Sequence, residues 1–204
     1  STATNIPCRR KDGIRFYADI KATVAEIEGE PHAIAFFRDV TERHRSDALL
    51  RARLRLSTLS PDCSLDELLR VTLDETEIVT DSQVGYFHFL DDDAATVTLQ
   101  QWSTNTVGER CTAEGKGHSY AIAEAGVWAE CVRERQAKIY NDYGRLPQRR
   151  ELPEGHAPVT RLISVPVQRN GKIVALVGVA DKAVDYDQQD VDCLLYTSPS
   201  PRDR

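Results

Sequence analysis

A two-residue turn between two apolar segments constrains the fold of this chain more than any other sequence feature. Asn170-Gly171 favours a type I′ turn, which joins neighbouring antiparallel strands. Before it, residues 161–168 place Ile163, Val165 and Val167 at alternate positions. After it, residues 172–179 contain the continuous apolar run 173–177. Such runs are typical of strands that are covered on both faces. The sequence therefore predicts a hairpin at the centre of an antiparallel sheet.

Other segments complete a domain around this hairpin. Ser64 and Glu67 form a capping box before a helix whose apolar residues recur at i, i+3 and i+4 up to Val79. Further strands are expected over 83–90, 96–102, 120–122 and 138–141, and further helices over 126–135 and 186–192. Two long connections, 103–117 and 142–158, have the length of binding loops or lids. We expect an α+β fold with helices on one face of an antiparallel sheet.

Seven stretches of this segment resemble the GAF domain family, specifically the type found in bacterial sensors. They are Gly85-Tyr86-Phe87-His88-Phe89, Gln101-Trp102-Ser103-Thr104-Asn105-Thr106, Cys111-Thr112, Gly126-Val127-Trp128-Ala129-Glu130-Cys131, Asn141-Asp142-Tyr143, Leu152-Pro153-Glu154-Gly155-His156 and Val177-Gly178-Val179-Ala180-Asp181-Lys182. We expect the GAF domain to span residues 61–192. The resemblance implies a parent protein that is most often a sensor histidine kinase and less often a diguanylate cyclase.

A lysine near the end of the domain belongs to a longer pattern. Asp181-Lys182, Tyr186 and Asp190 are similar to the Asn-Lys…Phe…Asp pattern of cyclic-nucleotide-binding GAF domains, with Asp in place of Asn and Tyr in place of Phe. We expect Lys182 and Asp190 to form an ion pair that holds the last helix on the sheet.

The first forty residues have the alternation of β-strands. A turn at 11–13 precedes a long strand over 14–27, and a second turn at 28–31 precedes a strand over 32–40. Three antiparallel strands alone leave one face of the sheet uncovered.

Two motifs in this segment resemble the C-terminal strands and exit of a PAS sensor domain. They are Arg10-Lys11-Asp12-Gly13 and Phe37-Arg38-Asp39-Val40-Thr41-Glu42-Arg43. The resemblance implies that residues 1–42 are the end of a PAS domain and that Asp39 and Thr41 connect its last strand to the following helix. The first strands and pocket helices of that family are absent from the sequence, so we expect no PAS ligand site.

A helix is expected between these two segments, with residues 43–60 as the linker. Its seam residues follow steps of 3, 4 and 3, as in a coiled coil, and are Leu49, Ala52, Leu56 and Leu59. One interpretation is a parallel homodimer that transmits signals between sensor domains. The alternative is a helix that lies on its own domain.

Composition and net charge indicate which partners and which cellular compartment to expect. The net charge of −6 argues against nucleic acid as the main partner. No apolar run approaches the ~20 residues that span a membrane. The five scattered cysteines indicate free thiols in a reducing compartment, so a cytoplasmic location is expected, although the parent could be attached to a membrane elsewhere.

The candidate ligand site combines aromatic walls with a few polar groups, as small-molecule pockets do. Its expected residues are Trp102, Thr104, Asn105, Cys111, Tyr120, Trp128, Asn141, Tyr143 and His156. The effector is unidentified, and the sequence requires no cofactor. A domain that binds nothing and serves only as a dimerisation spacer is the alternative.

No catalytic residues or metal ligands are expected. The five histidines lack HExxH or HxH spacing, and Lys116 is not followed by the Ser or Thr of a phosphate-binding loop. A cysteine–histidine pair could be formed by Cys111 with His118 or His156, but no spacing requires it. We therefore expect this chain not to be an enzyme.

The C-terminal residues have an unusual composition. Residues 193–204 contain Pro199 and Pro201, which a helix interior rejects. They also resemble the translated reading frame of a DNA sequencing adapter. We expect a non-native tail here, which would interrupt the last GAF helix near Asp192.

Overall fold

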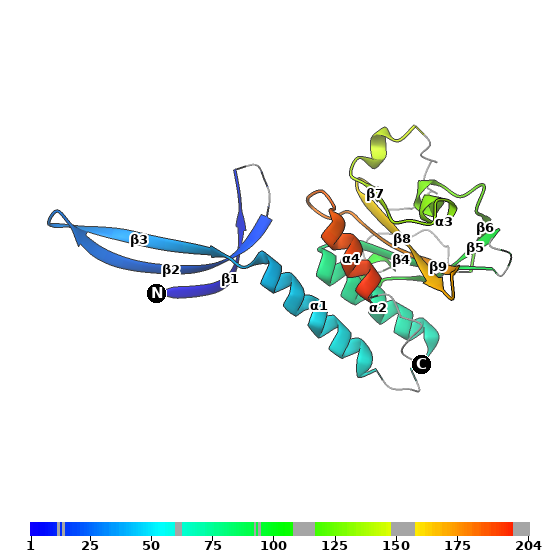
Figure 1. The fold of residues 1–204 in the computed structure, drawn as a ribbon, viewed down its shortest axis with the longest axis horizontal. Coiled ribbons are helices and arrows are strands. Elements are labelled where there is room, and N and C mark those ends of the chain that lie inside the picture. The colour runs from blue at the N-terminus through cyan, green and yellow to red at the C-terminus, as the bar shows by residue number, and fades with distance from the viewer. Residues whose placement is uncertain are drawn as a thin grey trace. The chain divides into compact units, whose positions relative to one another are not determined.

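The computed structural model describes residues 1–11, 13, 15–59, 63–91, 93, 95–107, 117–147 and 158–197 (Figure 1). The chain divides into two compact units, Ser1–Leu50 and Arg51–Arg204.

The first unit contains the three predicted antiparallel strands, β1 (Thr2–Arg9), β2 (Arg15–Ile27) and β3 (Glu30–Asp39), in the order β1-β2-β3. Phe36 and Phe37 are neighbours in β3 and are each 63% exposed. Successive side chains of a strand point to opposite faces. Large apolar groups are therefore exposed on both faces, and the prediction that this sheet cannot enclose a core is confirmed.

Helix α1 (Thr41–Ser57) begins directly after β3. The Thr41 backbone N–H and hydroxyl both donate to Asp39 Oδ1, at 3.0 and 2.6 Å, and Thr41 Oγ1 accepts from the Tyr17 N–H at 2.9 Å. The bonds from Thr41, with Arg10 beside them, lower the pKa of Asp39. These two residues thus join β2, β3 and α1 as the sequence predicted. The assignment to a PAS domain stays a prediction.

The second unit contains a six-stranded antiparallel sheet in the order β6-β5-β4-β9-β8-β7. Its strands are β4 (Val84–Leu90), β5 (Thr96–Trp102), β6 (Ser119–Ala121), β7 (Lys138–Tyr140), β8 (Leu162–Arg169) and β9 (Lys172–Ala180). The turn between β8 and β9 has φ of 50° at Asn170 and 75° at Gly171. Positive φ at both positions is what a type I′ turn requires, so the predicted central hairpin and α+β class are confirmed.

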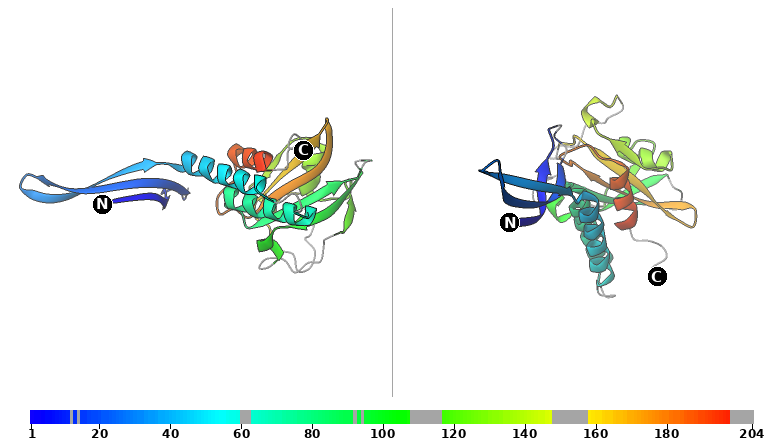
Figure 2. Two further views of the ribbon diagram at one scale, coloured as in Figure 1. Left: turned by 90° about the horizontal axis from the view of Figure 1, so that it is seen from below. Right: turned by 60° about the vertical axis from the view of Figure 1, so that its left-hand side comes forward.

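Helices α2 (Leu65–Thr80) and α4 (Gln188–Thr197) lie side by side on one face of this sheet (Figure 2). We call it the α2/α4 face; its core includes Leu69, Leu73, Phe87 and Leu194. The opposite face is covered by η2 (Val127–Ala129), α3 (Glu130–Arg133) and η3 (Tyr143–Arg145), and we call it the α3 face.

Helix α2 has the predicted cap, because Ser64 Oγ accepts from the Glu67 N–H at 3.2 Å. The expected apolar stripe starts later than predicted, since Leu65 is 50% exposed. Three threonines lie buried on this helix, and each donates its hydroxyl to a carbonyl one turn earlier at 2.7–2.8 Å; they are Thr72, Thr76 and Thr80. Polar side chains are therefore accommodated in the core because their hydroxyls are bonded.

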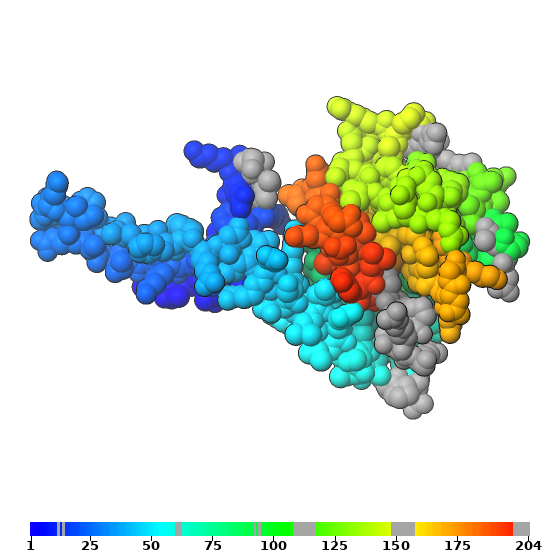
Figure 3. All heavy atoms as spheres, viewed as in Figure 1, coloured from blue at the N-terminus to red at the C-terminus, as the bar shows by residue number. Residues whose placement is uncertain are grey.

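Helix α4 continues to Thr197 and does not end near Asp192. Cys193 and Leu194 are buried, and Thr197 Oγ1 lies 3.0 Å from Thr76 Oγ1 of α2. The expected interruption is thus wrong for residues 193–197, because the prolines come after the helix. Figure 3 shows α4, in red, at the surface. The origin of residues 193–204 stays a prediction.

The second half of α1 packs within its own unit. Ala52 is fully buried, Arg55 Nη1 lies 2.5 Å from Glu75 Oε1, and the Arg53 guanidinium lies 5.1 Å from the Tyr196 ring centroid. Leu50 and Leu54 are 58% and 57% exposed. The predicted seam is therefore corrected in part: Ala52 contacts its own domain, while Leu50 and Leu54 form the open stripe.

Candidate functional site

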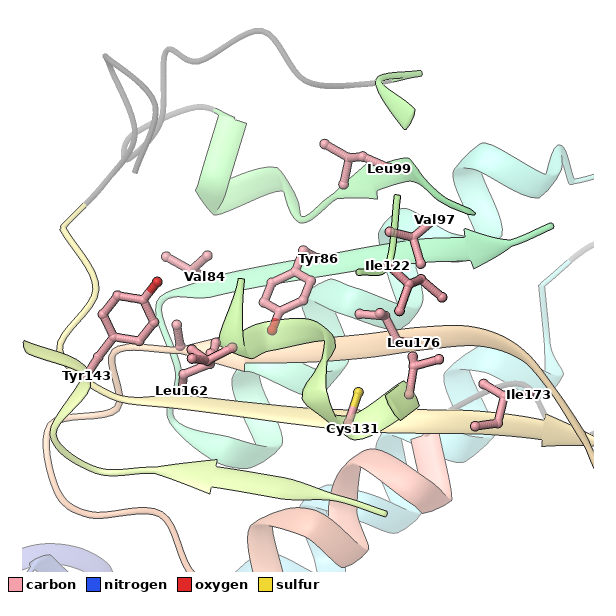
Figure 4. Close-up of a cluster of buried hydrophobic side chains, with 13 residues drawn as sticks. Val84, Tyr86, Val97, Leu99, Ile122, Cys131, Tyr143, Leu162, Ile173 and Leu176 are labelled. Carbon is pink, nitrogen blue, oxygen red and sulfur yellow. The ribbon is translucent and has the colours of Figure 1, made fainter. Parts of the chain in front are cut away.

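Successive side chains of strand β4 point to opposite faces of the sheet. Phe87 packs on the α2/α4 face. Val84 and Tyr86 belong to the core of the α3 face, which Figure 4 shows. His88 follows the same alternation and lies on the α3 face against Tyr86 and Trp128. The α3 face is the surface on which the structure assembles an aromatic cluster.

Tyr86 is fixed at the bottom of this cluster. Its Oη lies 2.9 Å from Ser164 Oγ of β8, and burial raises the pKa of its phenol. A Cβ at Gly178 would lie 2.2 Å from Tyr86 Cζ and Oη and 2.7 Å from the Ile163 carbonyl oxygen. Only glycine at this position of β9 leaves room for the tyrosine ring.

His88 is the residue that sequence reasoning missed. It is 5% exposed, and its ring stacks on Trp128 with a centroid distance of 4.6 Å. Its Nδ1 is buried and has no hydrogen-bond partner among the described residues. Burial lowers the pKa of His88 to about 3, so the imidazole is neutral. Alternation with Tyr86 along β4 was the signal that could have identified it.

Three predicted ligand-site residues gather around Tyr86 and His88. The Trp102 ring lies 6.2 Å from Tyr86, and the Tyr120 ring lies 6.3 Å from Trp128, both edge to face. Aromatic rings in this arrangement attract one another beyond their burial of area. The structure therefore brings Trp102, Tyr120 and Trp128 together around Tyr86 and His88.

Two further predicted residues have structural partners. Asn141 donates to the Tyr186 carbonyl at 3.1 Å and accepts from the Tyr186 N–H at 2.8 Å, which holds the segment before α4. Tyr143 is 5% exposed and belongs to the core of the α3 face.

Thr104 and Asn105 correct the prediction. The Thr104 N–H and hydroxyl donate to Asp74 of α2 at 2.7 and 2.8 Å, and Arg70 donates to Thr104 Oγ1 at 3.0 Å. Asn105 donates to the Gln83 carbonyl at 2.7 Å. Both side chains thus bind α2 and the entry to β4, because residues 104–107 form a short helical turn beside α2.

The cysteine chemistry has little support in the described part of the chain. Cys111 and His156 lie outside the described residues. Cys131 is fully buried, and burial raises the pKa of its thiol to about 12. A thiol of such high pKa holds almost no thiolate near neutral pH and is a poor nucleophile.

A polar groove of about 410 Å³ lies beside the aromatic cluster. It is lined by Ala123, Ala125, Gly126, Val127, Glu130, Arg133 and Glu134. Arg133 donates to the carbonyls of Ile122 and Ala125 at 2.8 and 3.2 Å. Glu134 pairs with Lys138, and Glu130 accepts from the Tyr140 hydroxyl. The charged groups of this groove are thus engaged in holding the fold.

The predicted lysine pair is present in the structure. Lys182 Nζ lies 2.7 Å from both carboxylate oxygens of Asp190, and the two side chains are 5% and 3% exposed. Tyr186 Oη accepts from the Lys182 N–H at 3.2 Å and lies 2.8 Å from Ser82 Oγ. Burial raises the pKa of the Tyr186 phenol above its usual range. This network fastens α4 to the end of β9 and to the segment after α2.

A six-stranded antiparallel sheet with α2 and α4 on one face and an aromatic cluster on the other defines a GAF-type sensory domain. The chain belongs to the family described as "GAF domain", which it matches over residues 63–196. It therefore carries the GAF sensory domain of a signalling protein. None of the described helices combines the length and apolar character needed to cross a membrane.

One curated relative is the methyl sulfide methyltransferase-associated sensor of the archaeon Methanosarcina acetivorans. It is 30% identical over 189 residues, which are 89% of this chain and 19% of the relative. The chain thus spans about a fifth of that protein's length.

Solved structures of other proteins share the fold. The GAF domain of an Acinetobacter phosphoenolpyruvate-protein phosphotransferase has a TM-score of 0.61 at 17% identity, covering 76% of this chain and 89% of that one. The free methionine-R-sulfoxide reductase of Neisseria meningitidis has a TM-score of 0.56 at 11% identity, covering 75% and 85%. At these identities the likeness concerns the fold alone.

Proposed function

We propose that this chain is a sensory module whose GAF domain binds a small, uncharged effector on the α3 face, in contact with His88. The observation that carries the proposal is the buried Nδ1 of His88, which has no partner among the described residues. Leaving such a group without a bond costs about 1–3 kcal/mol. A ligand that bonds to Nδ1 would offset that cost.

The charge distribution favours an uncharged effector. His88 is neutral because burial lowers its pKa to about 3. Within the described part of the α3 face, Arg133 and Lys138 are engaged with carbonyls and with Glu134. The proposed contacts are therefore aromatic stacking and one hydrogen bond, which suit a heteroaromatic compound better than a nucleotide phosphate.

The test is a thermal-shift and calorimetry screen of the full chain against neutral heteroaromatic compounds, with cyclic nucleotides as the charged comparison set. A compound that stabilises the wild type should lose its effect in H88F, which keeps an aromatic ring and removes both ring nitrogens. H118A is the matched control, because His118 is exposed, and it should bind as the wild type does. Binding that H88F leaves unchanged would contradict the role of His88.

The second candidate function is a dimerisation spacer that binds nothing. It is favoured by the filled aromatic core, in which His88 already stacks on Trp128 at 4.6 Å. A screen without any stabilising compound would support it.

The wider role follows from the resemblance and from the sensor relative. The proposed parent is a homodimeric sensor histidine kinase, with a diguanylate cyclase as the alternative, in which residues 1–42 are the end of a PAS domain and α1 transmits the signal. An effector can drive this change only if it binds two conformations with different affinity. The exposed stripe of Leu50 and Leu54 is the part of α1 open to a second copy.

A further inference from the structure

A buried chain of hydrogen bonds links β4 to helix α2 on the side of the sheet away from His88. The Gly85 N–H donates to Thr106 Oγ1 at 3.0 Å, and Thr106 Oγ1 lies 2.6 Å from Ser103 Oγ. The Ser103 hydroxyl donates to Glu77 Oε1 of α2. Ser103 is fully buried, and Thr106 and Glu77 are 1% and 6% exposed. This series of hydrogen bonds therefore ends at the side-chain carboxyl group of Glu77, inside the protein.

The donors and acceptors of this hydrogen-bond series all run in one direction. Each hydroxyl has one proton, so Gly85 donates to Thr106, Thr106 to Ser103 and Ser103 to Glu77 when Glu77 is ionised. Hydrogen bonds to a charged acceptor are about twice as strong as those to a neutral one. Protonation of Glu77 therefore weakens one of the bonds that attach residues 103–107 to α2, beside those from Thr104 to Asp74.

The surroundings of Glu77 favour the protonated, uncharged form of its carboxyl group. Burial raises the pKa of Glu77 to about 7, and the Asp74 carboxylate one turn earlier adds to the rise. Asp74 is itself bonded to Thr104 and lies 3.5 Å from Arg70. From the β4 entry and the 103–107 turn, the groups that face Glu77 are uncharged, namely Gly85, Ser103, Asn105 and Thr106.

We propose that Glu77 is a proton-binding site that couples the ambient pH to the attachment of residues 103–107 to α2. This turn directly follows β5, which carries Trp102 of the aromatic cluster. Linkage is reciprocal, so any ligand that displaces the turn also changes proton uptake by Glu77. The inference does not depend on the proposed effector site.

The sign of the pH effect follows from the raised pKa. Glu77 binds its proton more tightly in the folded protein than in the unfolded protein, where the pKa of its carboxyl group is 4.5. The stability that the proton contributes is fully present below pH 4.5 and is lost as the pH rises through about 7.

The test is an NMR titration of the full chain from about pH 5.5 to about pH 8.5. The amide signals of Gly85 and Thr106 and the side-chain carboxyl carbon of Glu77 should shift together, with a midpoint near 7. In E77Q, which imitates the neutral carboxyl, the amide shifts should disappear. E75Q is the matched control, because Glu75 is equally buried at 6% on the same helix and pairs with Arg55, and it should keep them.

Two results would overturn the proposal. One is a carboxyl signal of Glu77 that does not titrate in this range, as expected if its pKa stays near the unfolded value of 4.5. The other is an amide titration that persists in E77Q. The carboxyl measurement uses the wild type, so it decides the question even if E77Q does not fold.

Discussion

Removal of Lys182 should destabilise the GAF domain strongly. The ion pair with Asp190 is almost fully buried, with both oxygens 2.7 Å from Nζ. K182M leaves the carboxylate in the core without its counter-ion, although it still accepts from the Asp187 N–H at 3.0 Å. Breaking one partner of a buried pair costs about 3–5 kcal/mol. For a chain of this size, that corresponds to a fall in melting temperature of roughly 10 °C.

The assay is urea unfolding followed by tryptophan fluorescence. Trp102 and Trp128 both lie in the second unit, so the signal reports its unfolding. The double variant K182M/D190L replaces the pair with apolar groups and should cost less than the sum of K182M and D190L, because each single variant leaves one buried charge that the double variant lacks.

The control is the exposed pair of Arg161 and Asp185, which has a comparable contact of 2.9 Å. Asp185 is 70% exposed, so D185N should cost at most about 1 kcal/mol. A loss below about 1 kcal/mol for K182M would refute the reasoning, as would additive effects of the two single variants.

Two other predictions concern the Tyr86 ring and helix α1. G178A should lower the unfolding free energy by about 1–3 kcal/mol, because its Cβ would lie 2.2 Å from Tyr86; an equal loss in a Y86A background would contradict this cause. L54E should convert a dimer of the chain into a monomer in sedimentation, because Leu54 is 57% exposed on α1. An unchanged mass, or a wild-type monomer, would count against the α1 dimer.

Local patterns in the sequence predicted most of the elements. The turn at Asn170-Gly171 and the cap at Ser64 depend on residues within three or four positions, so their geometry follows from nearby chemistry. Lys182 and Asp190 are separated by eight positions, and their pairing was predicted from a family pattern. The expected strand β5 has the observed bounds Thr96–Trp102.

The candidate site could be predicted only in part. Trp102, Tyr120 and Trp128 were identified because aromatic side chains beside long loops are typical of pockets. Thr104 and Asn105 were expected in the same cluster, but residues 104–107 form a helical turn beside α2, and the Thr104 N–H donates to Asp74 of that helix. Ser103 caps this turn locally, because its Oγ accepts from the Thr106 N–H at 3.2 Å, but the bonds to Asp74 and Gln83 join segments that are distant in the sequence.

The sequence by itself determined most of the helices, strands and turns, and which side chains alternate along each strand. Only the tertiary structure decided which buried polar groups have partners. Ser103 reaches Glu77 across 26 positions, and Tyr86 reaches Ser164 across 78. His88 has the same alternation as Tyr86 but has no such partner for Nδ1 in the described structure. The physical reason is that alternation is a property of one strand, whereas hydrogen bonding in a core depends on segments that meet only when the sheet and helices pack.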